Sequence, residues 1–339
     1  MNTRIVAVGL CAYLAVPIVM LVRSMTTTDS TIELLNVSYD PTRELYRKIN
    51  RAFSDEYRET TGLAVRIRQS HGGSGSQARA VIDGLPADVL TLAMWADIDA
   101  VRKKGLVADD WEGRLPDRSL PYTSTIVFVV RKGNPFRIRD WPDLMQSDLK
   151  IITANPKTGG GAKLSLLAAW GSVVRSGGTT EDAEAFIARM YRQTPVLDSG
   201  ARGSTITFAR RMIGDVHLTW ENEALLEARE LPDELEVVYP KSSIRAEPHV
   251  AMVDAVTNAK GTGAVAEAYL RFLYSEKGQE IIAENFFRPS HPDVAKKYAD
   301  RFGKIDDLFT IRDLFAGGWD EAQKVFFADG AMFDRIYSR

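Results

Sequence analysis

The stretch IELLNVSYDPT, residues 32–42, sets the fold because it leads an apolar run directly into a helix start. Residues Ile32–Tyr39 have the pattern of a buried strand. Asp40 and Pro41 then give a helix-start signal, with Asp40 as the N-cap and Pro41 in the first helical position. We expect the helix to cover residues 41–59. A strand that runs straight into a helix is the first half of a β–α–β unit.

The same alternation continues along the chain. Residues 63–69 and 87–93 are the next predicted strands, and residues 76–83 are the helix between them. This β–α–β–α–β order predicts a parallel sheet with helices on its faces, so the fold class is α/β. A second series is predicted from strands at 124–131, 149–153, 194–197, 215–220, 235–239 and 248–254, and from helices at 161–175, 181–192 and 204–213. We find neither an internal repeat nor a low-complexity linker, which favours two lobes that exchange strands.

Four loops between an extended segment and a helix are rich in Asp, Ser, Gly and Pro. A helix start exposes unpaired backbone N–H groups and the positive end of the helix dipole, so it suits an anion. One such loop would be ordinary, but four in both halves of the chain point to one shared anion. The loops are NVSYDPTR (36–43), QSHGGSGSQ (69–77), NPKTGGGA (155–162) and LDSGARGS (197–204).

The first two loops each offer one candidate group. Asp40 is either a structural N-cap or a residue whose backbone N–H faces a ligand. Ser74 offers a hydroxyl donor at a helix start, and Gly73 and Gly75 beside it allow the backbone to approach a ligand closely. A plain tight turn is the alternative. The loop lacks the Gly-Lys-Ser/Thr ending of a nucleotide-binding P-loop.

The other candidates lie in the second half of the chain. Gly159, Gly160 and Gly161 open a long predicted helix with N–H groups that no β-carbon obstructs. Ala201 and Arg202 lie at another helix start, where Arg202 either neutralises the region or pairs with a carboxylate. Trp220 ends a predicted strand, and its indole N–H is a donor with no acceptor side, although a buried Trp is more often a core residue.

The composition limits the classes of function. Of 339 residues, 45% are hydrophobic and 26% are charged, and 43 Lys and Arg balance 45 Asp and Glu. Without a basic surplus, nucleic acid is not an expected partner. The single cysteine, Cys11, excludes an internal disulfide, and the four His residues never fall at metal-ligand spacing. We therefore expect neither a metal nor another cofactor.

Residues 1–30 form a separate segment. An apolar run from Ile5 to Val22 lies between Arg4 and Arg23, which is typical of a long signal peptide or a short membrane anchor. A lipoprotein signal at Cys11 is a weaker alternative, because Leu10 precedes the cysteine. Each alternative places the rest of the chain outside the cytoplasm.

An enzyme is the alternative from another class. Ser74 would be the nucleophile of a hydrolase acting on sulfo- or phospho-esters, and His71 is the nearest base. Adjacent residues on one strand rarely present Ser and His to each other, and the sequence offers no acidic partner. We therefore expect no enzymatic activity.

Long stretches of the chain resemble the bacterial sulfate-binding proteins of ABC importers, which are type II periplasmic binding proteins. The similarity extends from Ile32 to Arg339, through NVSYDPTRELY, QSHGGSG, PYTSTIVFVVRKGNP, NPKTGGGA, VLDSGARGST, WENEALL and VAEAYLRFLYSEKGQEI. It implies two α/β lobes joined by crossover strands at 124–131 and 248–254, with the ligand between them. The first lobe would comprise residues 31–122 and 249–339, and the second residues 123–248.

The resemblance also implies roles for particular residues. Sulfate oxygens would accept from the backbone N–H groups of Asp40, Gly160, Gly161 and Ala201, from the Ser74 hydroxyl and from the Trp220 indole. The family usually has Ser where this chain has Gly159, so one hydroxyl donor is missing. The expected function is capture of sulfate, or alternatively thiosulfate, by a monomeric extracytoplasmic protein that delivers the anion to an ABC permease.

Overall fold

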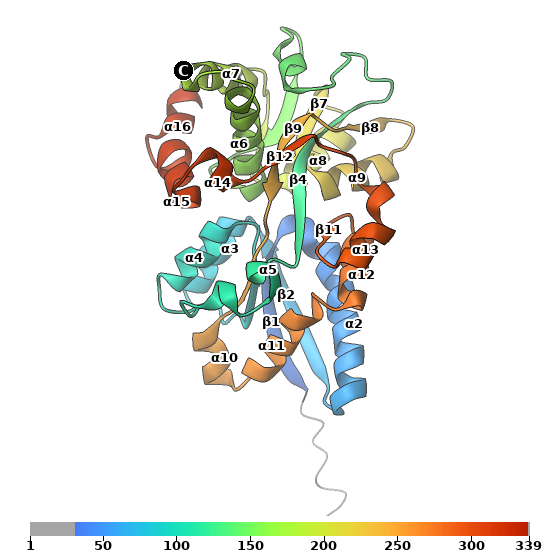
Figure 1. The fold of residues 1–339 in the computed structure, drawn as a ribbon, viewed down its shortest axis with the longest axis vertical. Coiled ribbons are helices and arrows are strands. Elements are labelled where there is room, and N and C mark those ends of the chain that lie inside the picture. Colours follow the sequence, from blue (N-terminus) through green and yellow to red (C-terminus); the bar gives the residue numbers. More distant parts are fainter. Residues whose placement is uncertain (1–30, 338–339) are drawn as a thin grey trace, which may run out of the picture.

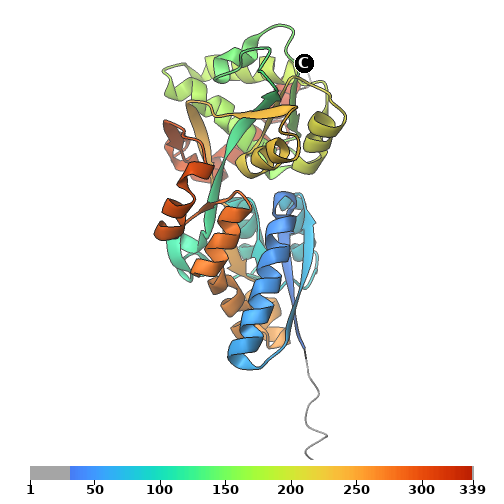
Figure 2. The same cartoon turned by 90° about the vertical axis from the view of Figure 1, so that its right-hand side faces the viewer.

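The computed structural model describes residues 31–337, and the expected signal peptide or anchor lies outside these residues. The chain forms two α/β lobes, one above the other in Figure 1. Strands that pass between the lobes gather on one side, and the lobes face each other across a gap on the other side (Figure 2). The predicted α/β class is confirmed.

The first lobe is built on a four-stranded sheet in the order β10-β3-β1-β2. Strand β1 pairs in parallel with both β2 and β3, and β10 is antiparallel to β3. This confirms the parallel β–α–β–α–β unit predicted from the N-terminal part of the sequence. The strands are β1 (Ile32–Tyr39), β2 (Val65–Gly72), β3 (Val89–Thr91) and β10 (Val250–Met252).

Helices cover the first sheet. On α2, Tyr46, Ile49 and Phe53 are buried at helical spacing, as the sequence predicts, and Gly62 ends the helix with a φ of 75°. The helices are α2 (Arg43–Thr61), α3 (Ser74–Ile82), α4 (Trp95–Arg102), α5 (Pro116–Ser119), α10 (Asp254–Lys260), α11 (Gly263–Phe272), α12 (Glu276–Glu284) and α13 (Pro292–Lys297), with 3₁₀ turns at Asp40–Thr42, Trp111–Gly113 and Ala299–Arg301.

The second lobe contains a larger mixed sheet in the order β12-β9-β4-β7-β5-β6. Strands β8 and β11 also pair with β4. Strand β4 is antiparallel to β7, whereas β5 is parallel to β6 and β7. The strands are β4 (Tyr122–Arg131), β5 (Ile151–Ala154), β6 (Leu197–Asp198), β7 (Val216–Trp220), β8 (Leu235–Val238), β9 (Ser242–Ala246), β11 (Arg288–Pro289) and β12 (Asp307–Phe309).

The helices of the second lobe pack around this sheet, and α6 has more buried residues than any other of these helices. The helices are α6 (Gly160–Arg175), α7 (Thr180–Arg192), α8 (Ala201–Thr205), α9 (Glu221–Glu230), α14 (Ile311–Leu314), α15 (Gly318–Ala322) and α16 (Met332–Tyr337), with a 3₁₀ turn at Trp141–Met145 and π-helical turns at Ile206–Arg210 and Gln323–Phe327.

The crossings between the lobes differ in part from the prediction. Strand β4 is one long strand that crosses, as expected. The prediction of one long crossing strand at 248–254 is wrong. Only the short strand β10 forms there, and it belongs to the first sheet, whereas β9 before it belongs to the second. The chain passes between the lobes at residues 247–249, where neither sheet pairs with it.

The C-terminal segment corrects the expected lobe boundary. Residues from Asp307 onward were expected in the first lobe, but β12 pairs in parallel with β9 of the second sheet. Aromatic side chains then join the second core: Phe326 meets Trp170 at a ring distance of 4.9 Å, and Phe333 meets Tyr191 at 5.1 Å. Burial of these rings against α6 and α7 holds the segment in the second lobe.

Two helix starts also differ from the prediction. The helix expected at 204–213 begins at Ala201 and changes to a π-helical turn after Thr205. The helix expected at 41–59 opens with the 3₁₀ turn Asp40–Thr42, and the Asp40 side chain does not cap it. Its carboxylate instead accepts from Arg43 at 2.8 Å, so a charged neighbour replaces the backbone donors of a cap.

Candidate anion-binding site

The four predicted loops meet at one small cavity between the lobes. Most of the residues singled out in the sequence line it, and Gly75 and Arg202 do not. The predicted lining residues are Asp40, Gly73, Ser74, Gly159, Gly160, Gly161, Ala201 and Trp220. Sequence reasoning missed Tyr39, Pro41, Gly72, Ala93 and Gly200. Of these, only Tyr39 has a side-chain donor, a buried hydroxyl without a hydrogen-bond partner among the described residues.

Helix α6 contributes two donors at its first positions. Gly160 and Gly161 begin the helix, so their N–H groups have no acceptor in a preceding turn. The N–H of Gly159 is different, because it donates to the Asn155 carbonyl at 2.9 Å within the loop. Ala201 occupies the corresponding first position of α8. Three backbone donors from two helix starts therefore lie at the wall of the cavity.

Trp220 lies at the end of β7 and is only 1% exposed. Its ring packs against Tyr39 of the first lobe at a ring distance of 5.5 Å. Among residues 31–337 its indole N–H donates to no protein acceptor, although the residue lines the cavity. A β-carbon on Gly161 would overlap the Trp220 Nε1 atom. Only glycine at position 161 therefore leaves the indole in this position.

Ser74 is buried at the first position of α3. Its Oγ accepts from the Ala93 backbone N–H at 3.0 Å, which leaves the hydroxyl proton for another acceptor. Asp97 is one such acceptor: burial raises the pKa of this carboxyl, and a hydrogen bond from the Ser74 hydroxyl lowers it in part. Sequence reasoning missed Asp97, which carries no motif signal.

The two charged side chains near the cavity are held away from a direct role. Asp40 accepts from Arg43, which also donates to the His71 carbonyl at 3.2 Å. Arg202 lies 4.0 Å from Glu44 of the first lobe. Of the two sequence-based alternatives for Arg202, pairing with a carboxylate is the one that its position supports.

Glycines bring the lobes into close contact at the cavity. A β-carbon on Gly73 of the first lobe would lie 2.7 Å from the Thr158 carbonyl oxygen of the second. A β-carbon on Gly160 would lie 3.2 Å from Met94 Cγ. The backbone of each lobe thus reaches the other at the point where the donors converge.

Two titratable groups near the cavity are uncharged at neutral pH. Burial, with a smaller contribution from Arg43, lowers the pKa of His71 to about 4, so the imidazole is neutral. Burial and the neighbouring Glu227 raise the pKa of Glu223 to about 8, so this carboxyl is protonated. No hydrogen bond between Ser74 and His71 is present among the described residues. The geometry of a serine nucleophile with its base is therefore absent at these two residues.

A second pocket adjoins this cavity. It contains Gly75, which the sequence pointed to, together with Arg79, Asp97 and Lys163, and it shares Gly159 and Gly160 with the cavity. Burial lowers the pKa of Lys163. Lys157 also lines the pocket, and its ammonium group donates to Asp334 at 2.8 Å.

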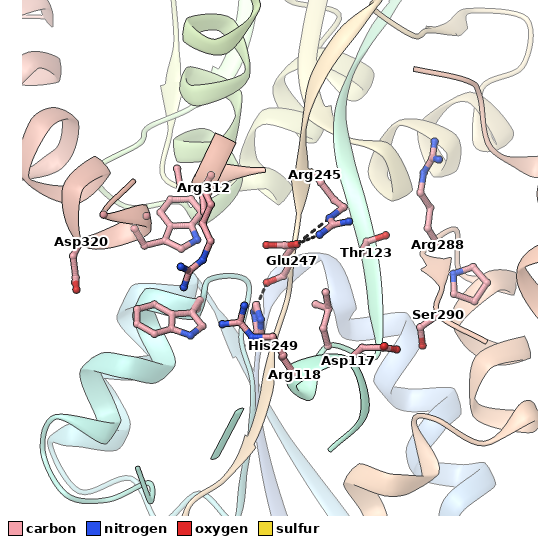
Figure 3. Close-up of a pocket in the computed structure, with 17 residues that line it drawn as sticks. Asp117, Arg118, Thr123, Arg245, Glu247, His249, Arg288, Ser290, Arg312 and Asp320 are labelled. Carbon is pink, nitrogen blue, oxygen red and sulfur yellow. Dashed lines mark hydrogen bonds and ion pairs between the residues drawn. The ribbon is translucent and has the colours of Figure 1, made fainter. Parts of the chain in front are cut away.

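A much larger cavity, about 670 Å³, lies elsewhere, beside the strands that cross between the lobes (Figure 3). Four arginines line it, and the guanidinium groups of Arg118, Arg245 and Arg288 are paired with carboxylates. Arg245 reaches Glu247 across the middle of the view, and Arg288 donates to Glu221 at 2.6 and 2.7 Å. No sequence motif indicated this cavity, because its residues come from six separated segments.

Two features are absent from residues 31–337. No group of three or more His, Cys, Asp or Glu side chains is arranged to hold a metal ion in this part of the chain. None of the helices described is both long and apolar enough to cross a membrane.

Comparisons with known proteins agree with the fold. A profile of the family described as "Bacterial extracellular solute-binding protein" matches residues 35–288. The chain is 54% identical to the sulfate-binding protein of Salmonella typhimurium over 94% of this chain and 97% of that protein. It is 49% identical to the thiosulfate-binding protein of Pseudomonas aeruginosa, over 90% of this chain and 92% of that protein.

The solved structure of the sulfate-binding protein SubI from Mycobacterium tuberculosis has a TM-score of 0.79 and 30% sequence identity, and the match covers 87% of this chain and 99% of that one. A family profile that covers most of the chain, relatives that match nearly full length and a closely similar solved fold all agree. The chain belongs to the bacterial extracellular solute-binding proteins, in the family of sulfate- and thiosulfate-binding proteins.

Proposed function

We propose that this protein captures sulfate in the small cavity between the lobes and delivers it to an ABC importer. The observation that carries the proposal is the convergence of donors from both lobes on one cavity without a cationic side chain. The donors are the N–H groups of Asp40, Gly160, Gly161 and Ala201, the Ser74 hydroxyl and the Trp220 indole. The two relatives described above are a sulfate-binding and a thiosulfate-binding protein, which agrees with this ligand class.

Sulfate suits such a site because it is a dianion without a proton at neutral pH. Every oxygen accepts, so a wall made of donors satisfies it, and hydrogen bonds to a charged group contribute about 1.5–3 kcal/mol each. Phosphate and arsenate carry a proton that requires an acceptor in the wall. A donor-only wall therefore discriminates against them.

The helix starts spread the charge of the anion. Each contributes a partial positive charge at the N-terminal end of its dipole, so no full cation has to be buried beside the ligand. The neutral His71 and protonated Glu223 fit this arrangement, since neither places a full charge at the cavity. Molybdate and tungstate are larger than sulfate, so a small cavity disfavours them.

The two lobes give the protein a state that an importer can recognise. Because donors come from both lobes, a bound anion stabilises the arrangement in which the lobes touch. We expect the protein to act as a monomer outside the cytoplasm, where it presents this closed form to the permease. No catalytic step belongs to this function, and the family is a non-enzymatic component of transport.

Calorimetric titration of residues 31–339 tests the proposal. Sulfate, thiosulfate, phosphate and molybdate are titrated separately, and sulfate or thiosulfate should release heat with 1:1 stoichiometry while phosphate should not. Absence of binding to both sulfate and thiosulfate would contradict the proposal. A change in Trp220 fluorescence on addition of sulfate gives an independent reading, because the indole lies at the cavity.

A further inference from the structure

Three buried polar residues form a chain of hydrogen bonds beneath the first turn of α8. Ser204, His217 and Glu227 come from α8, β7 and α9, and each is at most 3% exposed. Ser204 Oγ lies 3.0 Å from His217 Nε2, and His217 Nδ1 lies 3.1 and 3.2 Å from the two carboxylate oxygens of Glu227. No substrate reaches these groups from solvent, so the arrangement is not a catalytic triad at work.

The chain of hydrogen bonds ends at a residue of the proposed anion site. Ser204 Oγ lies 2.9 Å from the carbonyl oxygen of Ala201, the first residue of α8. Ser204 also lines a small internal cavity with Ala201, Gly161 and Trp220. Whatever sets the position of Ser204 therefore acts on the turn that presents the Ala201 N–H.

The hydrogen-bond donors can be assigned by counting protons. A carbonyl only accepts, so the single hydroxyl proton of Ser204 belongs to the Ala201 oxygen. His217 Nε2 must then donate to Ser204. At the other end, the Thr205 hydroxyl donates to Glu227 at 2.7 Å, and a further proton lies between His217 Nδ1 and the carboxylate. All of these bonds form together only when the His217–Glu227 pair holds two protons and no net charge.

The surroundings of His217 contain no competing charge in contact with the ring. The Phe208 ring packs against the imidazole at a ring distance of 5.4 Å, and the Arg131 guanidinium carbon lies 3.9 Å from the centre of the Phe208 ring. Glu223, one turn before Glu227 on α9, has its pKa raised to about 8 and is protonated at neutral pH. The remaining charged groups on or next to these elements are Arg202 on α8, Asp215 immediately before β7, and Glu221, Arg229 and Glu230 on α9.

This inference rests on the proposed anion site. We propose that the hydrogen bonds from Glu227 through His217 to Ser204 form a relay that fixes the first turn of α8. His217 is then a positioning residue for anion binding. The helix needs such support because it has only five residues and continues as a π-helical turn. A helix this short is not stable by its own hydrogen bonds. The relay supplies the missing constraint, without net charge beneath a bound dianion.

Substitution of Ser204 tests the link to the site. Ser204→Ala should weaken sulfate binding about tenfold in calorimetry, since it removes the bond to Ala201 and leaves His217 Nε2 without a partner. Ser204→Thr keeps the hydroxyl and should restore binding to within about threefold of the unaltered protein. Ser165→Ala is the matched control: Ser165 makes the same kind of bond, to the Gly161 carbonyl at 3.1 Å, but belongs to no relay. It should change binding less than about threefold.

A double-mutant cycle tests the role of His217. His217→Gln alone should weaken binding, whereas the same change in a Ser204→Ala background should add nothing, because the relay acts only through Ser204. Additive effects would overturn the proposal. Melting temperatures of the ligand-free variants show whether each one is folded.

The protonation state is measured on the unaltered protein, so it does not depend on a variant that folds. Nitrogen-15 NMR of the imidazole at pH 7 should show His217 Nε2 protonated, and an unprotonated Nε2 would overturn the relay. Failure of the unaltered protein to bind sulfate would contradict the proposed function, but it would not affect the NMR result on the protonation of His217 Nε2. Sulfate binding that is equal in the unaltered protein and in Ser204→Ala would contradict the relay alone.

Discussion

The cavity between the helix starts and the arginine-rich cavity beside the crossing strands offer two very different surfaces to an anion. The first is small, lined by glycines and backbone N–H groups, and contains no Lys or Arg. The second is about 670 Å³ and contains four arginines, three of which are paired with carboxylates: Arg118, Arg245 and Arg288. The difference is that the proposed anion site offers unpaired donors, whereas the second cavity offers cationic side chains that are mostly paired.

The largest effect on binding is expected at Gly161. Gly161→Ala would drive a β-carbon into Trp220 Nε1, which displaces the indole and obstructs the cavity. Sulfate affinity should fall by at least about 100-fold in calorimetry, since overpacking and the loss of a donor to a charged ligand add together. Gly159→Ala is the matched control, because a β-carbon there makes ordinary contacts of 3.5 to 3.6 Å. Similar losses in both variants would refute the special role of Gly161.

Gly73 should have the next largest effect, through the contact between the lobes. Gly73→Ala places a β-carbon 2.7 Å from the Thr158 carbonyl oxygen, so the lobes cannot approach as closely. We expect about tenfold weaker sulfate binding, mainly through faster dissociation measured by stopped-flow fluorescence. The control is Gly75→Ala, whose β-carbon would lie 3.6 Å from Asp97 Oδ1. An unchanged dissociation rate in Gly73→Ala would show that this contact does not limit closure.

A smaller effect on sulfate affinity should follow from a rise in pH. Glu223 is protonated below its pKa of about 8, and above that value it adds a negative charge near Asp40, Glu44 and Glu227, which Arg202 offsets only in part. Sulfate is a dianion throughout this range, so its affinity should fall severalfold as the pH rises from 7 to 9. Glu223→Gln should remove most of that fall. A pH profile identical in the two proteins would exclude Glu223 as its source.

The smallest effects should come from the arginine-rich cavity. Arg312→Gln removes an exposed guanidinium from that cavity without touching the helix starts. Sulfate affinity at 0.15 M ionic strength should change less than about twofold, because exposed charges are screened beyond a Debye length of about 8 Å. A tenfold loss of sulfate affinity would indicate that the anion binds in the arginine-rich cavity instead.

Gly159 offers a further test, because the sequence resemblance implies that related proteins have a Ser hydroxyl at this position. The space for a β-carbon at this position is adequate. Gly159→Ser should therefore preserve sulfate binding or tighten it by a few-fold, measured by the same titration. A large loss would show that the loop at 155–162 has a different geometry from that of the family.

The sequence predicted those parts of the molecule that depend on local pattern. The β–α–β–α–β unit follows from periodicity, and the position of Gly160 and Gly161 follows from a helix that starts within the run of three glycines. The position of Trp220 beside Gly161 could not follow from either residue alone. It depends on the register of β7 against β4 and β5, which pairs distant segments of the chain.

Other features depend on contacts that no local pattern records. The C-terminal helices resemble any amphipathic segment, and only the aromatic contacts of Phe326 and Phe333 assign them to the second lobe. Strand β9 was not predicted, and the strand predicted at 248–254 is reduced to β10, which ends where it leaves its pairing with β3. The buried chain from Ser204 to Glu227 was missed as well, since its members lie on three elements.

We propose that backbone and indole N–H groups, rather than arginines, hold the anion. Proton–nitrogen NMR of the protein titrated with sulfate tests this proposal directly. The amide signals of Gly160, Gly161 and Ala201 and the indole signal of Trp220 should move downfield together and saturate with one equivalent. Unmoved signals at these four groups, with movement instead at Arg245, Arg288 and Arg312, would contradict the claim.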